Sequence, residues 1–193
     1  MGGGSSKILD PEEVSEISSE TGFSAKQIHR LYNRYTTLDR SKAGYLKRQD
    51  FLLIPELAIN PLGDRIINEF FKGGEELNFR EFMQKVARFR KPNSSGVTEY
   101  NNREAKLRFL FGMYDLDVDN RISRSELLSV LQMMVGASVT MEQINRIGER
   151  TMAEADVDGD GYITYDEFKA VRNQICILCF MHSVCLVNLV VVR

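Results

Sequence analysis

The chain has 193 residues, and its 43% hydrophobic and 27% charged content is typical of a globular protein with one or two small domains. Its formal net charge of −2 provides no basic field, so nucleic acid is excluded as an expected partner. All three cysteines, Cys176, Cys179 and Cys185, lie close to the C-terminus, which excludes a disulfide framework in the folded body.

The N-terminal segment, residues 1–23, combines a lipidation pattern with a first helix. Met1-Gly2 followed by Ser6 matches the N-myristoylation signal, which makes Gly2 the candidate lipidation site. One myristoyl chain binds a membrane weakly, with a constant of about 10⁴ M⁻¹, so a membrane client would have to supply a second anchor. Asp10 and Pro11 then provide the cap and the first residue of a helix.

Helix start signals continue along the chain, whereas strand-like alternation is nearly absent. Ser24 and Gln27 form a capping box, and Asn60-Pro61 is expected to open another helix. Further capping boxes are Ser123 to Glu126, Thr140 to Gln143, and Thr164 to Glu167. These signals predict an all-α protein.

Residues 24–90, which we call the N-lobe, contain two loops, and the first has the EF-hand pattern but few of its ligands. Loop I is DRSKAGYLKRQD, Asp39–Asp50, and it keeps an acid at the first place and Gly44 at the sixth. Ala43 and Lys47 stand at the fifth and ninth places, where oxygen ligands are expected. Calcium takes about six to eight oxygens, so loop I is predicted to be degenerate.

Loop II, Phe70–Glu81, is weaker still. Leu77 and the final Glu stand at the eighth and twelfth places, as the pattern requires. The first, third and fifth places, where acids are expected, hold Phe70, Lys72 and Gly74. Residues 91–102, KPNSSGVTEYNN, then resemble a flexible linker, and one continuous domain with a long surface loop is the alternative.

Residues 103–174, the C-lobe, contain two complete loop patterns. Loop III is DLDVDNRISRSE and loop IV is DVDGDGYITYDE. Acids at the first, third, fifth and twelfth places offer side-chain oxygens, and the seventh residue offers its backbone carbonyl. The predicted ligands are Asp115, Asp117, Asp119, Arg121 and Glu126 in loop III, and Asp156, Asp158, Asp160, Tyr162 and Glu167 in loop IV.

Two loops of this kind between capped helices predict two bound Ca²⁺ ions, because calcium prefers convergent carboxylate and carbonyl oxygens. Loop III has Asn120 at the sixth place, where Gly is expected, and Asn tolerates the left-handed conformation. Ile122 and Ile163, at the eighth places, should face each other on a short paired strand.

Three segments resemble the calcineurin B homologous proteins. They are IPELAINPLGDRIINEFF at Ile54–Phe71, ETGFS at Glu20–Ser24 and LLSVLQMMVG at Leu127–Gly136. The resemblance implies four EF-hands in two paired lobes, of which the first two are empty and the last two bind calcium. It also implies an N-myristoylated cofactor on the cytoplasmic face of the plasma membrane. There it would hold an amphipathic cytoplasmic helix of a sodium/proton exchanger and support the exchanger's activity and surface stability.

The regulatory chain of calcineurin is similar in layout but keeps ligands in all four loops, so loop I argues against that interpretation. Binding or inhibition of the calcineurin catalytic chain as a B-type regulator, or a role as a myristoylated calcium sensor, stays the alternative. The sequence has no nucleophile–base constellation, phosphate-binding Gly loop or His/Cys metal cluster, so an enzyme is not expected.

Residues 175–193, the tail, depart from this family, which continues with a polar segment. Ile175–Val192 carries no formal charge and reaches the lower bound of about 18 residues for a membrane-spanning helix. Three interpretations stay open: an alternative-exon or read-through sequence, an internal ligand for the protein's own groove, and a membrane anchor.

Overall fold

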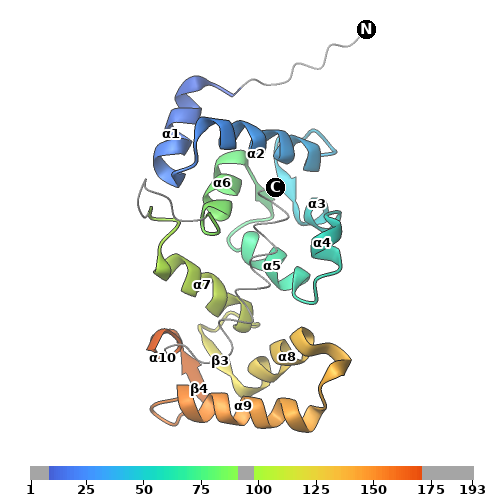
Figure 1. Ribbon diagram of the computed structural model, residues 1–193, viewed down its shortest axis with the longest axis vertical. Coiled ribbons are helices and arrows are strands. Elements are labelled where there is room, and N and C mark those ends of the chain that lie inside the picture. Colours follow the sequence, from blue (N-terminus) through green and yellow to red (C-terminus); the bar gives the residue numbers. More distant parts are fainter. Residues whose placement is uncertain (1–8, 91–97, 171–193) are drawn as a thin grey trace.

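A computed structural model of the protein describes residues 9–90 and 98–170, and it is mostly helical (Figure 1). The described N-terminal half contains α1 (Pro11–Thr21), α2 (Ala25–Leu38), β1 (Leu46–Lys47), α3 (Arg48–Leu52), α4 (Pro55–Ala58), α5 (Gly63–Phe70), β2 (Glu76–Leu77) and α6 (Phe79–Ala87). The described C-lobe contains α7 (Arg103–Tyr114), β3 (Arg121–Ser123), α8 (Arg124–Val135), a 3₁₀ turn (Gly136–Ser138), α9 (Met141–Ala155), β4 (Tyr162–Thr164) and α10 (Tyr165–Ala170).

The predicted helix caps are formed, with one shift. Asp10 accepts a hydrogen bond from the Glu12 N–H at the start of α1, and Ser24 opens α2 with a complete capping box. The helix expected at Asn60-Pro61 begins later, at Gly63. There the Asn60 side chain accepts from the Leu62 N–H at 2.9 Å, and this turn delays the first helical residue.

The strands are short and form two antiparallel pairs, each of which joins two neighbouring EF-hand loops. Leu46 pairs with Leu77 across β1 and β2, so the two degenerate loops form one unit. Ile122 pairs with Ile163 across β3 and β4, which confirms the predicted pairing of loops III and IV. The all-α fold built from paired EF-hands is confirmed.

Aromatic side chains fill the N-lobe core around Tyr35. Its ring makes an edge contact with Phe79 and a tilted contact with Phe82, at centroid distances of 5.3 and 5.5 Å. The Tyr35 hydroxyl donates to the carbonyls of Gly44 at 2.9 Å and Leu77 at 3.0 Å. One buried tyrosine therefore ties both degenerate loops to α2.

Helix α7 packs against the N-lobe and then leads into loop III (Figure 1). The Phe109 ring meets Phe70 and Phe89 edge-on, at centroid distances of 6.2 and 5.1 Å. Packing of this kind buries apolar area between the lobes, so the two lobes touch through α7.

Three sequence predictions fall on other parts of the chain. Gly2, most of the 91–102 linker and the 175–193 tail lie outside the described residues. Within the described ranges, no helix combines the length and the apolar character needed to cross a bilayer. The proposed domain boundaries stay predictions.

Candidate calcium sites

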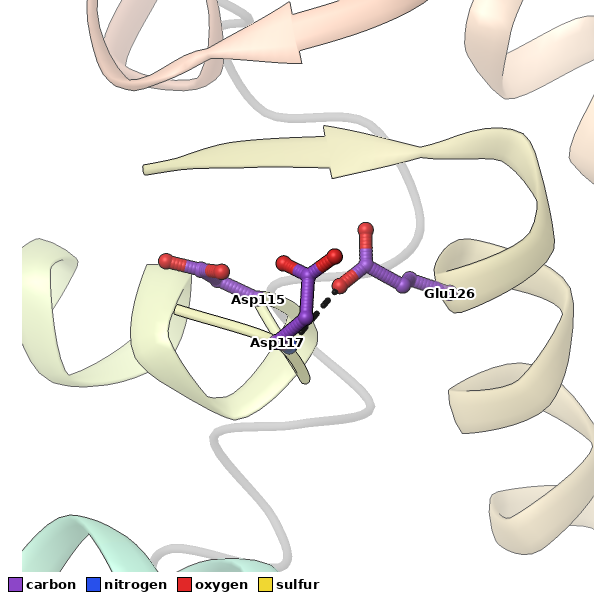
Figure 2. Close-up of side chains that lie close together, drawn as sticks. All are labelled: Asp115, Asp117 and Glu126. Atoms are coloured by element: carbon purple, nitrogen blue, oxygen red, sulfur yellow. Dashed lines mark hydrogen bonds between the residues drawn. The ribbon is translucent and has the colours of Figure 1, made fainter. Parts of the chain in front are cut away.

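Loop III brings three predicted ligands together. One carboxylate oxygen from each of Asp115, Asp117 and Glu126 lies within 4.8 Å of the other two. Figure 2 shows the three carboxylates side by side, at the end of α7, in the loop itself and in the first turn of α8. A local chain reversal between two helices therefore creates one cluster of oxygen donors.

Glu126 closes loop III because it belongs to the cap of α8. One carboxylate oxygen accepts hydrogen bonds from the Ser123 N–H at 2.8 Å and the Ser123 hydroxyl at 2.7 Å. The other accepts from the backbone N–H groups of Leu116 at 2.7 Å and Asp117 at 3.3 Å, and Figure 2 draws the last of these. Burial works to raise the pKa of Glu126, but these hydrogen bonds outweigh it and lower the pKa.

Asp115 anchors the other end of loop III from a buried position. It is 1% exposed, and its two oxygens accept from the N–H groups of Asp119 at 3.1 Å and Asn120 at 3.2 Å. Burial raises the pKa of Asp115. A buried carboxylate of this kind is best compensated by a nearby cation.

Loop IV repeats the arrangement with more exposed side chains. Asp156, Asp158 and Glu167 form the second group of three acids with oxygens within 4.8 Å. Glu167 accepts from the Val157 N–H at 2.8 Å and from the Thr164 hydroxyl at 2.7 Å. The hydrogen bonds from Thr164 and Val157 lower the pKa of Glu167 to about 2.

The fifth-place acids lie outside these two groups. Asp119 and Asp160 accept from the backbone N–H of the seventh residue, Arg121 or Tyr162, at 2.8 Å in each loop. Arg121 and Tyr162 are the first residues of β3 and β4, and the Arg121 guanidinium lies 4.6 Å from the Tyr162 ring. In each loop the structure therefore brings together the acids at the first, third and twelfth places. That the fifth and seventh residues are calcium ligands stays a prediction.

Sequence reasoning missed one backbone requirement of these loops. The fourth and sixth residues both have positive φ, 74° and 86° at Gly159 and Gly161 of loop IV. Loop III places Val118 and Asn120 there, with φ of 64° and 67°. Asn120 adopts this conformation as expected, whereas a β-branched valine adopts it only under strain.

The donor chemistry of both groups fits calcium. Each offers carboxylate oxygens from three acids, and hard oxygen donors in a flexible loop are what Ca²⁺ prefers. Bound at these groups, Ca²⁺ would offset the mutual repulsion of the carboxylates, and Asp115, Asp117, Glu126, Asp156, Asp158 and Glu167 would hold it.

Comparison with known proteins agrees with this geometry. Residues 104–171 match the EF-hand domain pair. The calcineurin B chain of Naegleria gruberi is 41% identical over 167 residues, which cover 86% of this chain and 90% of that protein. The calcineurin B chain of Schizosaccharomyces pombe is 35% identical over 172 residues, 89% of this chain and 91% of that protein. The type 2 calcineurin B chain of Dictyostelium discoideum is 38% identical and covers 86% and 87%.

The chain belongs to the calcineurin B-like family of EF-hand proteins. This membership confirms that the chain is a calcineurin B-like EF-hand protein, as the resemblance in its sequence implied, and it indicates Ca²⁺ binding. The EF-hand match and these relatives are consistent with a binding protein and not an enzyme. The exchanger partner implied by the resemblance is not tested by these relatives.

Loop I shows how this calcineurin B-like chain folds a loop without its ligands. Lys42 and Gly44 have φ of 55° and 86°, so the backbone repeats the conformation of the complete loops. Asp39 accepts from the N–H groups of Ala43 at 3.0 Å and Gly44 at 2.8 Å, and Asp50 accepts from the Lys47 N–H at 2.7 Å. Loop III has the same backbone hydrogen bonds to Asp115 and Glu126, so loop I keeps the hydrogen-bonded frame of a complete loop and differs in its missing ligands.

Proposed function

We propose that this chain is a calcium-binding regulatory protein of the calcineurin B type, with one Ca²⁺ ion in loop III and one in loop IV. The observation that carries the proposal is the pair of three-acid groups in adjacent, strand-paired loops. Identity of 35% and 41% to two calcineurin B chains over most of the length supports the same kind of role.

The partner that we favour is a helix of a calcineurin catalytic chain. The relatives are named as calcineurin B chains, and their similarity extends over 86% of this chain. Among the described residues, Met133, Met141 and Ile147 leave apolar surface on α8 and α9, with exposed fractions of 40%, 50% and 42%. Flexible methionines suit contact with an amphipathic partner helix.

A second candidate is a cofactor of a plasma-membrane sodium/proton exchanger. Loop I favours it, because Ala43 and Lys47 stand at its fifth and ninth places, where oxygen ligands are expected, as suits a lobe that stays folded without calcium. In this proposal the chain lies on the cytoplasmic face of the plasma membrane, and a myristoyl group on Gly2 adds to the anchoring by the exchanger.

Peptide binding distinguishes the two partners. Fluorescence anisotropy would compare a peptide of the B-binding helix of a calcineurin catalytic chain with a peptide of the cytoplasmic exchanger helix, each with calcium and with EDTA. Tighter binding of the first peptide supports the calcineurin-type regulator. Tighter binding of the second, retained in EDTA, supports the exchanger cofactor. Binding of neither peptide would refute both partners and leave only the calcium sites.

A further inference from the structure

One arginine of the N-lobe holds the helix that leads into loop III. Arg65, on α5, donates from Nε to the Met113 carbonyl at 3.2 Å. Its terminal nitrogen donates to the carbonyls of Gly112 at 2.9 Å and Asp115 at 3.1 Å. Three hydrogen bonds from one planar guanidinium fix the end of α7 relative to α5.

These carbonyls lie at the C-terminal end of α7, where backbone carbonyl groups have no hydrogen-bond donor within the helix. The last four carbonyls of an α-helix lack intrahelical donors, and the helix end carries a partial negative charge. Helix α7 ends at Tyr114, and Asp115, the first ligand of loop III, follows directly. Arg65 therefore satisfies the helix end and at the same time holds the backbone of a calcium ligand.

Close packing around this contact leaves little room for α5 and α7 to shift. A Cβ atom at Gly112 would come 2.5 Å from the Glu69 carboxylate, so the absence of a side chain there permits the approach of α5. Glu69 is 7% exposed, and its neighbour Phe70 meets the Phe109 ring of α7. The Arg65 hydrogen bonds are thus supported by a tight interface between the same two helices.

We propose that Arg65 is a positioning residue for loop III and that it couples calcium binding in this loop to the packing of the N-lobe. The proposal rests on the proposed function, in that loop III must bind calcium. Coupling between two sites is reciprocal, so calcium in loop III should also stabilise α5. A degenerate lobe would in this way respond to calcium without binding it.

Two effects of Arg65 on calcium oppose each other. Its positive charge lies near Asp115 and repels a cation, whereas its hydrogen bonds hold the Asp115 backbone in place. The guanidinium contacts carbonyl oxygens, which are neutral groups, and the carboxylate oxygens of Asp115 are held separately by Asp119 and Asn120. We expect positioning to be the larger of the two effects, so removal of Arg65 should weaken calcium binding.

The test uses the full chain with Glu167→Gln, which leaves loop III as the binding loop. Calorimetric calcium titration would compare this parent with versions that also carry Arg65→Met or Arg65→Lys. Lysine keeps the charge and loses the planar fork, so it separates repulsion from positioning. Arg80→Met is the matched control, because Arg80 pairs with Glu16 and Glu20 inside the N-terminal half.

We expect Arg65→Met to weaken calcium binding about tenfold, within the usual range of coupling between sites. Arg65→Lys should weaken it by a smaller factor, and Arg80→Met should leave it unchanged. Calcium should also slow amide hydrogen exchange across α5 in the parent, and this protection should be lost in Arg65→Met. Should Arg65→Met fail to fold, Arg65→Lys takes its place, with the same direction expected.

Unchanged or tighter calcium binding by a folded Arg65→Met protein would overturn the proposal, as would full retention of the calcium protection of α5. A different failure has a different meaning. If the Glu167→Gln parent itself binds no calcium, the proposed calcium function of loop III is wrong, and the coupling is wrong with it.

Discussion

At the residue scale, the terminal Glu of each complete loop is both a helix-capping residue and a candidate calcium ligand. Glu126 and Glu167 accept hydrogen bonds from the capping residues of α8 and α10, and each contributes a carboxylate oxygen to the group of three acids in its loop. Gln keeps one acceptor oxygen and the size of the side chain but loses the charge. A Glu→Gln substitution at this place should therefore weaken calcium binding more than it weakens the helix cap.

We predict that Glu126→Gln and Glu167→Gln each remove one Ca²⁺ ion from the stoichiometry, because calcium binding needs the bidentate carboxylate at the twelfth place. Calorimetric titration should show two ions bound to the natural chain, with dissociation constants in or below the sensor range of about 10⁻⁷–10⁻⁵ M. A protein with both substitutions that still bound calcium strongly would contradict the assignment.

Val118 should carry backbone strain that glycine would release. A left-handed conformation costs a side chain about 1–2 kcal/mol, and the greater freedom of unfolded glycine costs about 0.5–1 kcal/mol. Val118→Gly should therefore raise the free energy of unfolding by about 0.5–1 kcal/mol, measured by chemical denaturation. Val157→Gly is the matched control, since Val157 is 79% exposed and is not among the residues with positive φ. Equal effects of the two substitutions would count against strain at Val118.

The Asp39 carboxylate predicts a pH dependence for loop I. Burial raises its pKa, but hydrogen bonds from Gly44, Ala43 and Ser41 outweigh burial, so the pKa is lowered. Asp39 then stabilises the fold above the pKa of an unfolded aspartate, about 3.9, and this stability is lost as the pH falls through the lowered folded value.

Asp39→Asn should lower the free energy of unfolding by about 1.5–3 kcal/mol at pH 7, the range for hydrogen bonds to a charged group. The difference between the two proteins should shrink at acidic pH, where Asp39 is protonated in both the folded and unfolded chains. Urea unfolding at several pH values would measure it. A difference that stays constant down to pH of about 2 would show that charge is not the cause.

At the scale of elements, helices joined through short strand pairs keep the degenerate lobe folded. The Tyr35 hydroxyl on α2 reaches both loop I and β2, through the carbonyls of Gly44 and Leu77. This contact links the two loops without any cation in loop I. The lobe therefore has its own connection between paired loops.

Tyr35→Phe should lower the free energy of unfolding by about 1–3 kcal/mol, because two carbonyls lose a donor in a buried place. Calcium affinity should change little. Tyr32→Phe is the matched control, since the Tyr32 ring also packs on Phe79 but is only partly buried. Thermal unfolding would compare them, and equal losses for both substitutions would show that the Tyr35 hydroxyl has no special role.

At the scale of the whole molecule, membrane recruitment and calcium binding should be separable. Gly2 lies far along the chain from loops III and IV, and a myristoyl group acts only through the lipid or a groove. Gly2→Ala should abolish myristoylation and weaken recruitment to membranes, with the calcium titration unchanged. Mass spectrometry and membrane flotation of protein from eukaryotic cells would measure both, and an unmodified Gly2 in the natural chain would disprove the lipid proposal.

The sequence by itself determined the local part of this protein. EF-hand ligands lie within twelve consecutive residues, so spacing alone identified loops III and IV and the missing ligands of loop I. Capping boxes are local too, and those at Ser24, Ser123 and Thr140 all formed. The pairing of Ile122 with Ile163 could be predicted in the same way, because both are the eighth residues of their loops.

Only the tertiary structure decided what depends on contacts between distant segments. Met113 is fully buried in the core, and its burial depends on the helices that pack around it. Arg65 reaches the end of α7 across 47 to 50 residues of sequence, and no local pattern marks that contact. Side-chain packing between helices sets which carbonyls an arginine meets, so the link between the degenerate lobe and loop III became visible only in the folded chain.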